Sequence, residues 1–326
     1  VLAFDADSGK PAWQADSDWT NGMAADTAPA AQAALATATG KDKSLAPYNL
    51  TVPGDGQSFS LPTPASDGQR IYVKCSTGTV CAYGLDGKRL WRHADAGLNL
   101  TPMAGSSPIV VGGKVVYIAT SATSATKADK RALIATALDA ASGVVAWKTP
   151  GLTPAGYRMS GTPLATRIGD QVVIILPTGD VLRASDGSRL EGQVTASVLG
   201  SSPVVVGSTV FTTFSPSGPN GHTLPECWLH AQELAISGNR LTATEVFKVL
   251  RNGFTLSPPL VHQDVVTIVG AKGLERWRVA DGTPLPTPGR LALPTNGHAF
   301  WPAPSAAGDV VMLINLAGEV HLLAAA

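Results

Sequence analysis

The sequence is poor in charged residues, in aromatic residues and in cysteine. Charged residues make up 15% of its 326 residues and aromatic residues 6%, and there are three cysteines. Lysine and arginine together number 24, as do aspartate and glutamate, so the formal net charge is zero. A balanced charge gives no electrostatic reason to expect binding to nucleic acid or to an anionic membrane surface.

Long apolar runs and common catalytic motifs are missing as well. No apolar run approaches the roughly 18 residues of a membrane-spanning helix, so the sequence predicts no transmembrane segment. The six histidines form no HxH or HxxxH pair, and no CxxC occurs, which argues against a structural zinc site. GxSxG and Walker-type glycine motifs are also lacking. A catalytic triad assembled from distant residues stays open.

Glycine and proline are abundant, and one pattern built around glycine recurs. The 34 glycines and 24 prolines suit an all-β protein with many turns. TALDAASGVVAWK at 136–148 runs from an apolar strand through Asp and a turn Gly to a second strand with Trp. FDADSGKPAW at 4–13 and YGLDGKRLW at 83–91 repeat this order, and 181–190, 229–241 and 274–285 repeat it more weakly. Asp and Gly favour the tight turn, and the Trp supplies a large apolar side chain on the returning strand.

A second pattern, marked by proline, alternates with the first. The prolines lie 40 to 56 residues apart, at Pro64, Pro108, Pro163, Pro203, Pro259 and Pro304. Seven residues after each proline comes an apolar pair, except after Pro163, where two more residues intervene. In the unit that Pro108 begins, we expect further strands at 115–119, 134–139 and 145–148. Four short strands in a period of this length are typical of a propeller blade.

Three of these stretches resemble the repeat of the pyrroloquinoline-quinone-like (PQQ-like) β-propellers: LDAASGVVAW, YGLDGKRLW and FDADSGKPAW. At blade level the resemblance covers nearly the whole chain. It implies an all-β fold, a seven-bladed propeller of four-stranded antiparallel blades. The family contains quinoprotein dehydrogenases with a quinone and a calcium ion. It also contains members without cofactor that bind proteins, such as the outer-membrane assembly lipoprotein and secreted bacterial propellers.

The enzyme branch implies a pair of adjacent cysteines against the quinone and a set of Glu, Asn and Asp around calcium. Here Cys75, Cys81 and Cys227 are all separate, and no acidic cluster is found near the ends of the innermost strands. We therefore expect no cofactor, no metal site and no enzymatic activity. The expected function is that of a scaffold for protein–protein interaction. A ligand-binding or sensor propeller, and a hydrolase or lyase with a site at the channel mouth, stay open as alternatives.

The blade pattern also predicts how the chain divides. Residues 1–14 supply only the third and fourth strands of a first blade, residues 15–58 form an insert, and residues 59–326 form six further blades of the same domain. The alanine-rich stretch 24–40 favours a short helix in the insert. The last blade lacks its fourth strand, so we expect N-terminal strands of the first blade to be missing from this chain. The alternative is that the two ends pair with each other.

Three long connections predict where a partner binds. Residues 15–58, 120–132 and 215–227 all fall on the propeller face opposite the tight turns, and loops of such length are usually functional or disordered. On that face, residues just before the innermost strands approach the channel mouth, namely Phe59, Met103, Arg158, Met159, Leu199, Phe254, His298, Phe300 and Trp301. These residues either bind a partner or pack between neighbouring blades.

Cys75 and Cys81 flank the predicted hairpin tip STGTV and are expected to face each other across it. They are either a disulfide, which would require an oxidising compartment, or two small apolar residues. The disulfide and the resemblance together predict a periplasmic or extracellular protein, whose signal peptide is not in this chain.

Overall fold

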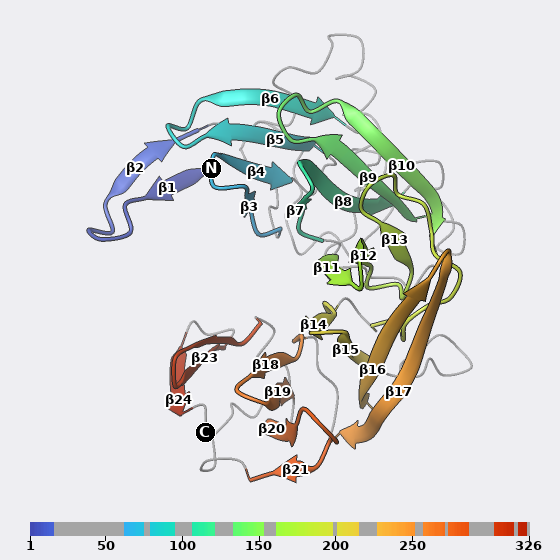
Figure 1. The fold of residues 1–326 in the computed structure, drawn as a ribbon. Helices are drawn as coiled ribbons and strands as arrows, with labels where there is room; N and C mark the ends of the chain where they lie inside the picture. The colour runs from blue at the N-terminus through green and yellow to red at the C-terminus, as the bar shows by residue number, and fades with distance from the viewer. Residues whose placement is uncertain are drawn as a thin grey trace, which may run out of the picture. The chain divides into compact units, whose positions relative to one another are not determined.

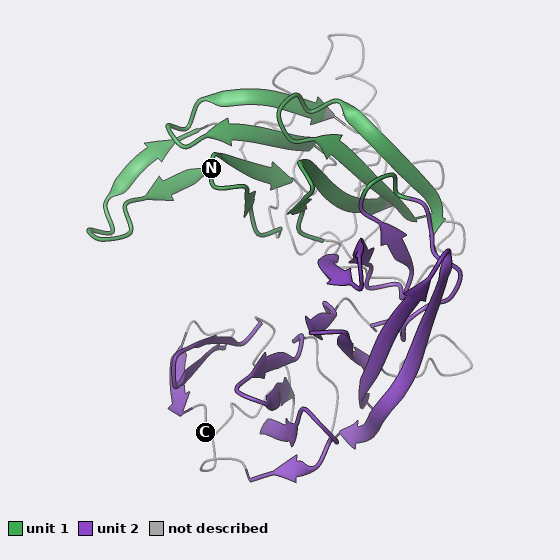
Figure 2. Cartoon of the chain, in the orientation of Figure 1, with its two compact units in different colours: residues 1–154, 185–187 green, residues 155–184, 188–326 purple. Residues whose placement is uncertain are grey.

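The computed structural model describes twelve stretches of the chain, and every regular element within them is a β-strand (Figure 1). The described residues are 1–15, 62–74, 79–94, 106–120, 133–152, 161–197, 201–214, 227–251, 257–270, 273–286, 303–315 and 319–324. They divide into two compact units (Figure 2). The first unit comprises residues 1–154 and 185–187, and the second comprises 155–184 and 188–326.

The first unit contains three antiparallel sheets, each a meander in chain order. The first sheet holds β1 (Leu2–Phe4) and β2 (Pro11–Gln14). The second holds β3 (Ala65–Ser66), β4 (Arg70–Lys74), β5 (Thr79–Gly84) and β6 (Arg89–Ala94). The third holds β7 (Ile109–Val111), β8 (Lys114–Thr120), β9 (Leu133–Asp139) and β10 (Val145–Leu152).

The second unit contains four more sheets of the same kind. The fourth sheet holds β11 (Leu164–Ile168), β12 (Gln171–Ile175) and β13 (Val181–Arg183). The fifth holds β14 (Val204–Val206), β15 (Thr209–Phe214), β16 (Cys227–Ser237) and β17 (Arg240–Arg251). The sixth holds β18 (Leu260–His262), β19 (Val265–Gly270), β20 (Gly273–Arg278) and β21 (Pro284–Leu285). The seventh holds β22 (Ser305–Ala307), β23 (Val310–Ile314) and β24 (Val320–Ala324).

Each of the six recurring prolines directly precedes the first strand of a sheet, from Pro64 before β3 to Pro304 before β22. Proline has no N–H to donate to a ladder, so it suits the start of a strand better than its middle. The serine before Pro108 or Pro203 also joins consecutive sheets. Ser107 Oγ accepts a hydrogen bond from the Thr63 N–H at 2.8 Å, and Ser202 Oγ accepts one from the Thr162 N–H at 2.9 Å.

The repeated Asp/Ser-Gly turn and Trp form a joint between neighbouring sheets. Trp91 of β6 lies on Gly143, in the turn between β9 and β10, where an added Cβ would come within 2.6 Å of the indole. Trp13 lies on Gly87 and Trp147 on Gly187 in the same way, all within the first unit. In the second unit Phe247 replaces the tryptophan and lies on Gly282. The turn residue is therefore glycine both because its φ is positive and because an aromatic ring occupies the space of a side chain.

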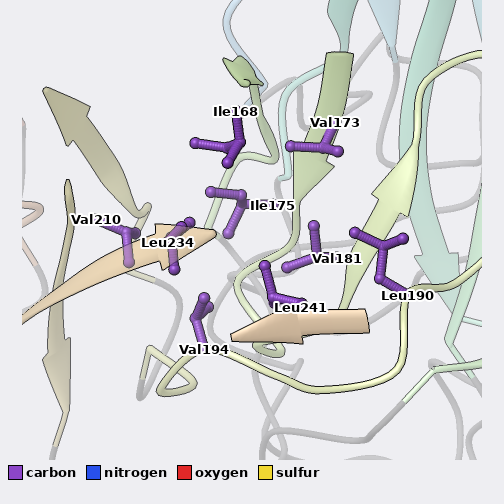
Figure 3. Close-up of a cluster of buried hydrophobic side chains, with 9 residues drawn as sticks. All are labelled: Ile168, Val173, Ile175, Val181, Leu190, Val194, Val210, Leu234 and Leu241. Atoms are coloured by element: carbon purple, nitrogen blue, oxygen red, sulfur yellow. The ribbon is translucent and has the colours of Figure 1, made fainter. Parts of the chain in front are cut away.

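Apolar side chains between consecutive sheets form the core. In the second unit, one cluster joins the fourth sheet to the fifth (Figure 3). Its members are buried aliphatic residues: Ile168, Val173, Ile175, Val181, Leu190, Val194, Val210, Leu234 and Leu241. A second cluster joins the fifth and sixth sheets around Phe211, Phe247 and Trp277. Because strands within these clusters bury side chains on both faces, their sequences are apolar runs rather than strict alternations.

The fourth sheet departs from the predicted four strands. After β13 the chain makes a single bridge, from Leu182 to Arg189, instead of a fourth strand. The next residue but one, Glu191, pairs with Arg240 at the start of β17 in the neighbouring sheet. Gly192, at φ +115°, then passes so close to Leu241 that an added Cβ would overlap the Leu241 carbonyl oxygen. Attachment to β17 thus replaces the fourth strand of this sheet.

Candidate partner-binding surface

The strand order places the long connections at equivalent ends of their sheets. Residues 121–132 join the second and third strands of the third sheet, and residues 215–226 do the same in the fifth. Residues 16–61 run from the last strand of the first sheet to the first strand of the second. In a meander these connections all leave a sheet at the end opposite its tight turns.

The residues of these connections lie outside the described part of the chain. Of the predicted ranges 15–58, 120–132 and 215–227, the structure describes Ala15, Thr120 and Cys227. The same holds for all nine residues predicted at the channel mouth: Phe59, Met103, Arg158, Met159, Leu199, Phe254, His298, Phe300 and Trp301. The predicted helix at 24–40 lies outside it too. The partner face, its aromatic anchors and this helix therefore stay predictions.

The structure places Cys81 opposite Val73 in the β4–β5 ladder, whereas the sequence predicted that it faces Cys75. The register pairs Lys74 with Val80, and four residues, 75–78, separate the two strands. The Cys81 thiol is a buried free cysteine, and burial raises its pKa. Cys75 lies outside the described residues, and a disulfide between the two stays a prediction that thiol counting under denaturing, non-reducing conditions tests.

At the opposite ends of the sheets, the tight turns are closed by their own hydrogen bonds. Asp67 accepts hydrogen bonds from the Gln69 N–H (2.9 Å), the Arg70 N–H (2.6 Å) and Oη of Tyr72 (2.7 Å). Burial alone would raise the pKa of Asp67, but these donors outweigh it and lower the pKa to about 2. Burial, together with the Asp67 carboxylate, raises the pKa of Tyr72 to about 12. Carboxylates that are satisfied by their own turn have little hydrogen-bonding capacity left for a partner.

A cationic and aromatic cluster lies beside the 215–226 connection, on one face of the fifth sheet. Lys248 Nζ lies 4.9 Å from the ring centroid of Phe214 and 4.7 Å from that of Trp228. Phe214 pairs with Trp228 across β15 and β16, and Trp228 pairs with Leu250 across β16 and β17. Lys248 and Leu250 are exposed, the latter to 53%. Cations over aromatic rings gain up to about 1 kcal/mol at exposed sites, so the ammonium group has a preferred position.

His230 lies next to this cluster, in contact with two different elements. Its Nδ1 is 2.7 Å from Oγ1 of Thr195, and its Nε2 is 3.1 Å from Oε2 of Glu245, an ion-pair distance without good hydrogen-bond alignment. Burial lowers the pKa of His230, and Glu245 opposes this only in part. The ring is therefore mostly neutral at pH 7 and leaves Lys248 as the cation of this cluster.

Among the described residues, no three His, Cys, Asp or Glu side chains come together as a metal site. No two of the three cysteines are adjacent in the sequence. Within the same part of the chain, no helix is long and apolar enough to span a membrane.

The comparison with known families agrees with the repeat pattern. Residues 1–283 match the family model described as outer membrane protein assembly factor BamB. The chain belongs to this family. It matches no curated protein sequence at a significant level.

Solved structures support the propeller fold. BamB from Moraxella catarrhalis aligns with a TM-score of 0.56 at 15% identity, over 82% of this chain and 75% of that one. The Dos1 propeller aligns with a TM-score of 0.55 at 10% identity, over 78% of this chain and 64% of its own. A europium-containing methanol dehydrogenase reaches a TM-score of 0.41 at 9% identity, over 80% and 72% of the two chains. The last likeness is too weak to bear on activity, and the first two establish the fold alone.

The sequence prediction missed the cluster formed by Phe214, Trp228 and Lys248. Their positions become adjacent only through the register of three strands, in which Phe214 pairs with Trp228 and His230 with Lys248. A signal was nevertheless present. Residues 227–251 form two long strands around a single Ser-Gly turn. Because the outer strand is unusually long, some of its side chains extend beyond the part of the sheet that neighbouring sheets bury.

Proposed function

We propose that this protein is a non-catalytic scaffold, a seven-bladed propeller that binds another protein in an exported or periplasmic complex. The observation that carries the proposal is the contrast between the two ends of its sheets. Long connections leave at one end, whereas tight turns with internally satisfied carboxylates occupy the other. Long loops carry binding residues more often than tight turns do. The family's description as an outer membrane assembly factor supports the exported setting.

The proposed partner-binding face consists of residues 15–58, 120–132 and 215–227. Phe300 and Trp301 are the proposed anchors, because a few aromatic residues tend to dominate the energy of an interface. The cluster of Phe214, Trp228 and Lys248 lies where the 215–226 connection joins the fifth sheet and extends this face onto β15, β16 and β17.

The experiment replaces residues 20–56 by a short Gly-Ser linker and, separately, makes Trp301→Ala. Complex formation is compared by co-purification from the native source, and circular dichroism confirms that each variant is folded. Asp86→Lys, in the β5–β6 turn, serves as a control at the opposite end of a sheet. We expect both face variants to lose the partner and the control to keep it. If both variants bind like the parent while Asp86→Lys does not, the face is wrong.

The enzyme alternative would require a histidine and an acid at an accessible site. His230 and Glu245 are such a pair, but the histidine is only 8% exposed. The pair also lies across strands β16 and β17, on the sheet face that contacts Thr195. This placement favours a structural role for the pair over catalysis.

A further inference from the structure

The outer edge of β17 is unusual in its length. β17 runs for 12 residues, whereas the outer strands β6, β10 and β21 have 6, 8 and 2. β17 is the last strand in the order of the fifth sheet, and β16 pairs with its inner edge. An edge strand presents a row of backbone N–H and C=O groups that an added strand can pair with. Length therefore makes β17 the most extensive such edge in the described part of the chain.

One end of this edge already takes an added chain segment. The Glu191 N–H donates to the Asn239 carbonyl oxygen, and the Leu241 N–H donates to the Glu191 carbonyl oxygen, both at 2.8 Å. Glu191 and Arg240 thus form a parallel bridge. The Leu241 N–H accordingly faces outward, and alternation along a strand gives Ala243 the same orientation.

The added segment leaves the edge after one residue. Beyond Gly192 the chain turns onto the face of the fifth sheet, where the Thr195 N–H donates to Oε1 of Gln232 at 2.8 Å. Within the described residues, nothing pairs with the outer edge from Thr242 to Leu250. The edge thus pairs with one residue of another segment at Arg240, and the nine residues from Thr242 to Leu250 follow it along the strand.

The side chains along this open edge favour a particular occupant. Val246 and Leu250 are 40% and 53% exposed. Lys248 is held over the Phe214 and Trp228 rings, on the same sheet face as Leu250. A strand added here would place one side chain beside Lys248 and the next but one beside Leu250, because side chains alternate between faces. Cross-strand pairs of opposite charge and apolar pairs both stabilise a sheet.

We propose that the outer edge of β17, from Thr242 to Leu250, binds an extended segment of a partner polypeptide as an added strand, with an acidic side chain beside Lys248 and an apolar one beside Leu250. The inference rests on the proposed scaffold function and adds to it a binding surface that adjoins the proposed partner-binding face at Lys248. A second copy of this chain is a poorer occupant, because a lysine on an edge strand discourages pairing between identical edges.

The test uses the full chain and a fluorescent, threonine-rich peptide of about ten residues, a common upper length for a strand. The peptide carries one aspartate and, two residues later, one leucine, and a second peptide has lysine in place of the aspartate. Binding is measured by fluorescence anisotropy. Lys248→Glu should weaken the aspartate peptide about fivefold and strengthen the lysine peptide, since exposed pairs contribute up to about 1 kcal/mol. Lys148→Glu, on the outer strand β10, is the matched control and should change neither.

A backbone variant tests the strand addition itself. Ala243→Pro removes an outward N–H and should weaken the aspartate peptide more than about tenfold, because proline cannot donate to the added strand. If this variant fails to fold, the peptide exchange with Lys248→Glu still decides the matter. Equal affinity of both peptides for the parent and for Lys248→Glu, or no binding of either peptide, would overturn the proposal. A dimer of the parent in sedimentation that Ala243→Pro abolishes would assign the edge to a second copy instead.

The outcome is separable from that of the scaffold test. The variant with residues 20–56 replaced should still bind the aspartate peptide, since the β17 edge is formed by residues 227–251. Loss of co-purification in the loop variant, with peptide binding absent in the parent, would retain the proposed function and reject the edge. If the parent binds the peptide and the loop variant still co-purifies with the partner, the β17 edge is retained and the proposed partner-binding face is rejected.

Discussion

The indole of Trp91 lies directly on Gly143, and its Nε1 donates a hydrogen bond to the carbonyl oxygen of Ala140 at 3.0 Å. Oη of Tyr72 lies 3.1 Å from the same carbonyl oxygen, and the Tyr72 and Trp91 rings are 5.9 Å apart. One turn of the third sheet is thus held by two aromatic side chains of the second. The same relation recurs at Trp13 with Gly87, where Nε1 donates to the Leu85 carbonyl oxygen at 2.8 Å.

Gly143→Ala should destabilise the protein by about 2–5 kcal/mol. The residue has φ +73°, which strains any L-residue by about 1–2 kcal/mol, and the new Cβ would overlap the Trp91 ring, which adds about 1–3 kcal/mol. Urea unfolding monitored by tryptophan fluorescence measures the loss.

Gly113→Ala is the matched control for this substitution. Gly113 has φ +71° in the β7–β8 turn of the same sheet, but nothing lies within 4 Å of its added Cβ. Gly113→Ala should therefore lose only the stability that the positive φ costs an L-residue, about 1–2 kcal/mol. Equal losses at the two glycines would show that the indole contact contributes nothing to stability.

The sequence predicted this joint only in part. Asp, Gly and Trp at regular spacing correctly indicated a turn and a returning strand, as found at β9 and β10. The spacing does not reveal that Trp91 rests on the glycine of the next repeat rather than on its own. That contact depends on how two sheets stack, and local propensity carries no information about it.

The strands were predictable for a similar reason, and the binding residues were not. The prolines and the apolar pairs that follow them mark the first and second strands, because backbone chemistry limits where proline can stand. The two extra residues after Pro163 correspond to the longer strand β11. The cluster at Lys248 arises from side chains of β15, β16 and β17, whose register is set by tertiary pairing. The predicted mouth residues, such as Trp301, lie outside the described residues and stay untested.

Acid should remove the stabilisation that Asp67 provides. Its pKa, lowered to about 2 in the folded chain, is below the ordinary value of 3.8. The stabilising effect is therefore complete above about pH 4 and is lost as the pH falls toward 2. After allowance for solvent screening at this turn, we expect a contribution of about 1–2 kcal/mol.

Urea unfolding between pH 5 and pH 2 measures the contribution of Asp67 to the free energy of unfolding. The proteins compared are the parent, Asp67→Asn and Tyr72→Phe. The parent should lose more stability across this range than Asp67→Asn, with Tyr72→Phe in between, because it removes only one of the donors. Parallel pH profiles for the parent and Asp67→Asn would show that the carboxylate is not stabilised by its turn.

His230 should make the second unit less stable below neutral pH. Burial lowers its pKa below 6.5 in the folded chain, so the unfolded chain binds the proton more readily. Stability is then full above the ordinary pKa and declines as the pH falls through it. His230→Gln keeps a polar side chain beside Thr195 but cannot titrate, and its stability should change less between pH 8 and pH 5.

The NMR titration of the His230 ring checks the cause directly. We expect a midpoint below 6.5 in the parent and a rise of that midpoint in Lys248→Gln, since the lysine lowers the pKa of the histidine. A midpoint above 6.5 in the parent would mean that attraction to Glu245, 3.1 Å away, outweighs burial.

Glu275→Gln should destabilise the protein far more than the removal of a surface ion pair. Arg251 has a fully buried side chain, and its Nη2 lies 2.8 Å from Oε2 of Glu275, which is 18% exposed. Its guanidinium also lies 5.9 Å from the Trp277 ring centroid. Removing the carboxylate leaves a buried charge without compensation, which typically costs about 3–5 kcal/mol.

Arg278 and Asp281 form a comparable pair at 3.2 Å, but their side chains are 51% and 50% exposed. Asp281→Asn should therefore cost far less stability than Glu275→Gln. Urea unfolding of both variants at pH 7 and at two salt concentrations provides the comparison. If Glu275→Gln is as mild as Asp281→Asn, the Arg251 charge is compensated by other groups, and the ion pair does not hold the fifth and sixth sheets together.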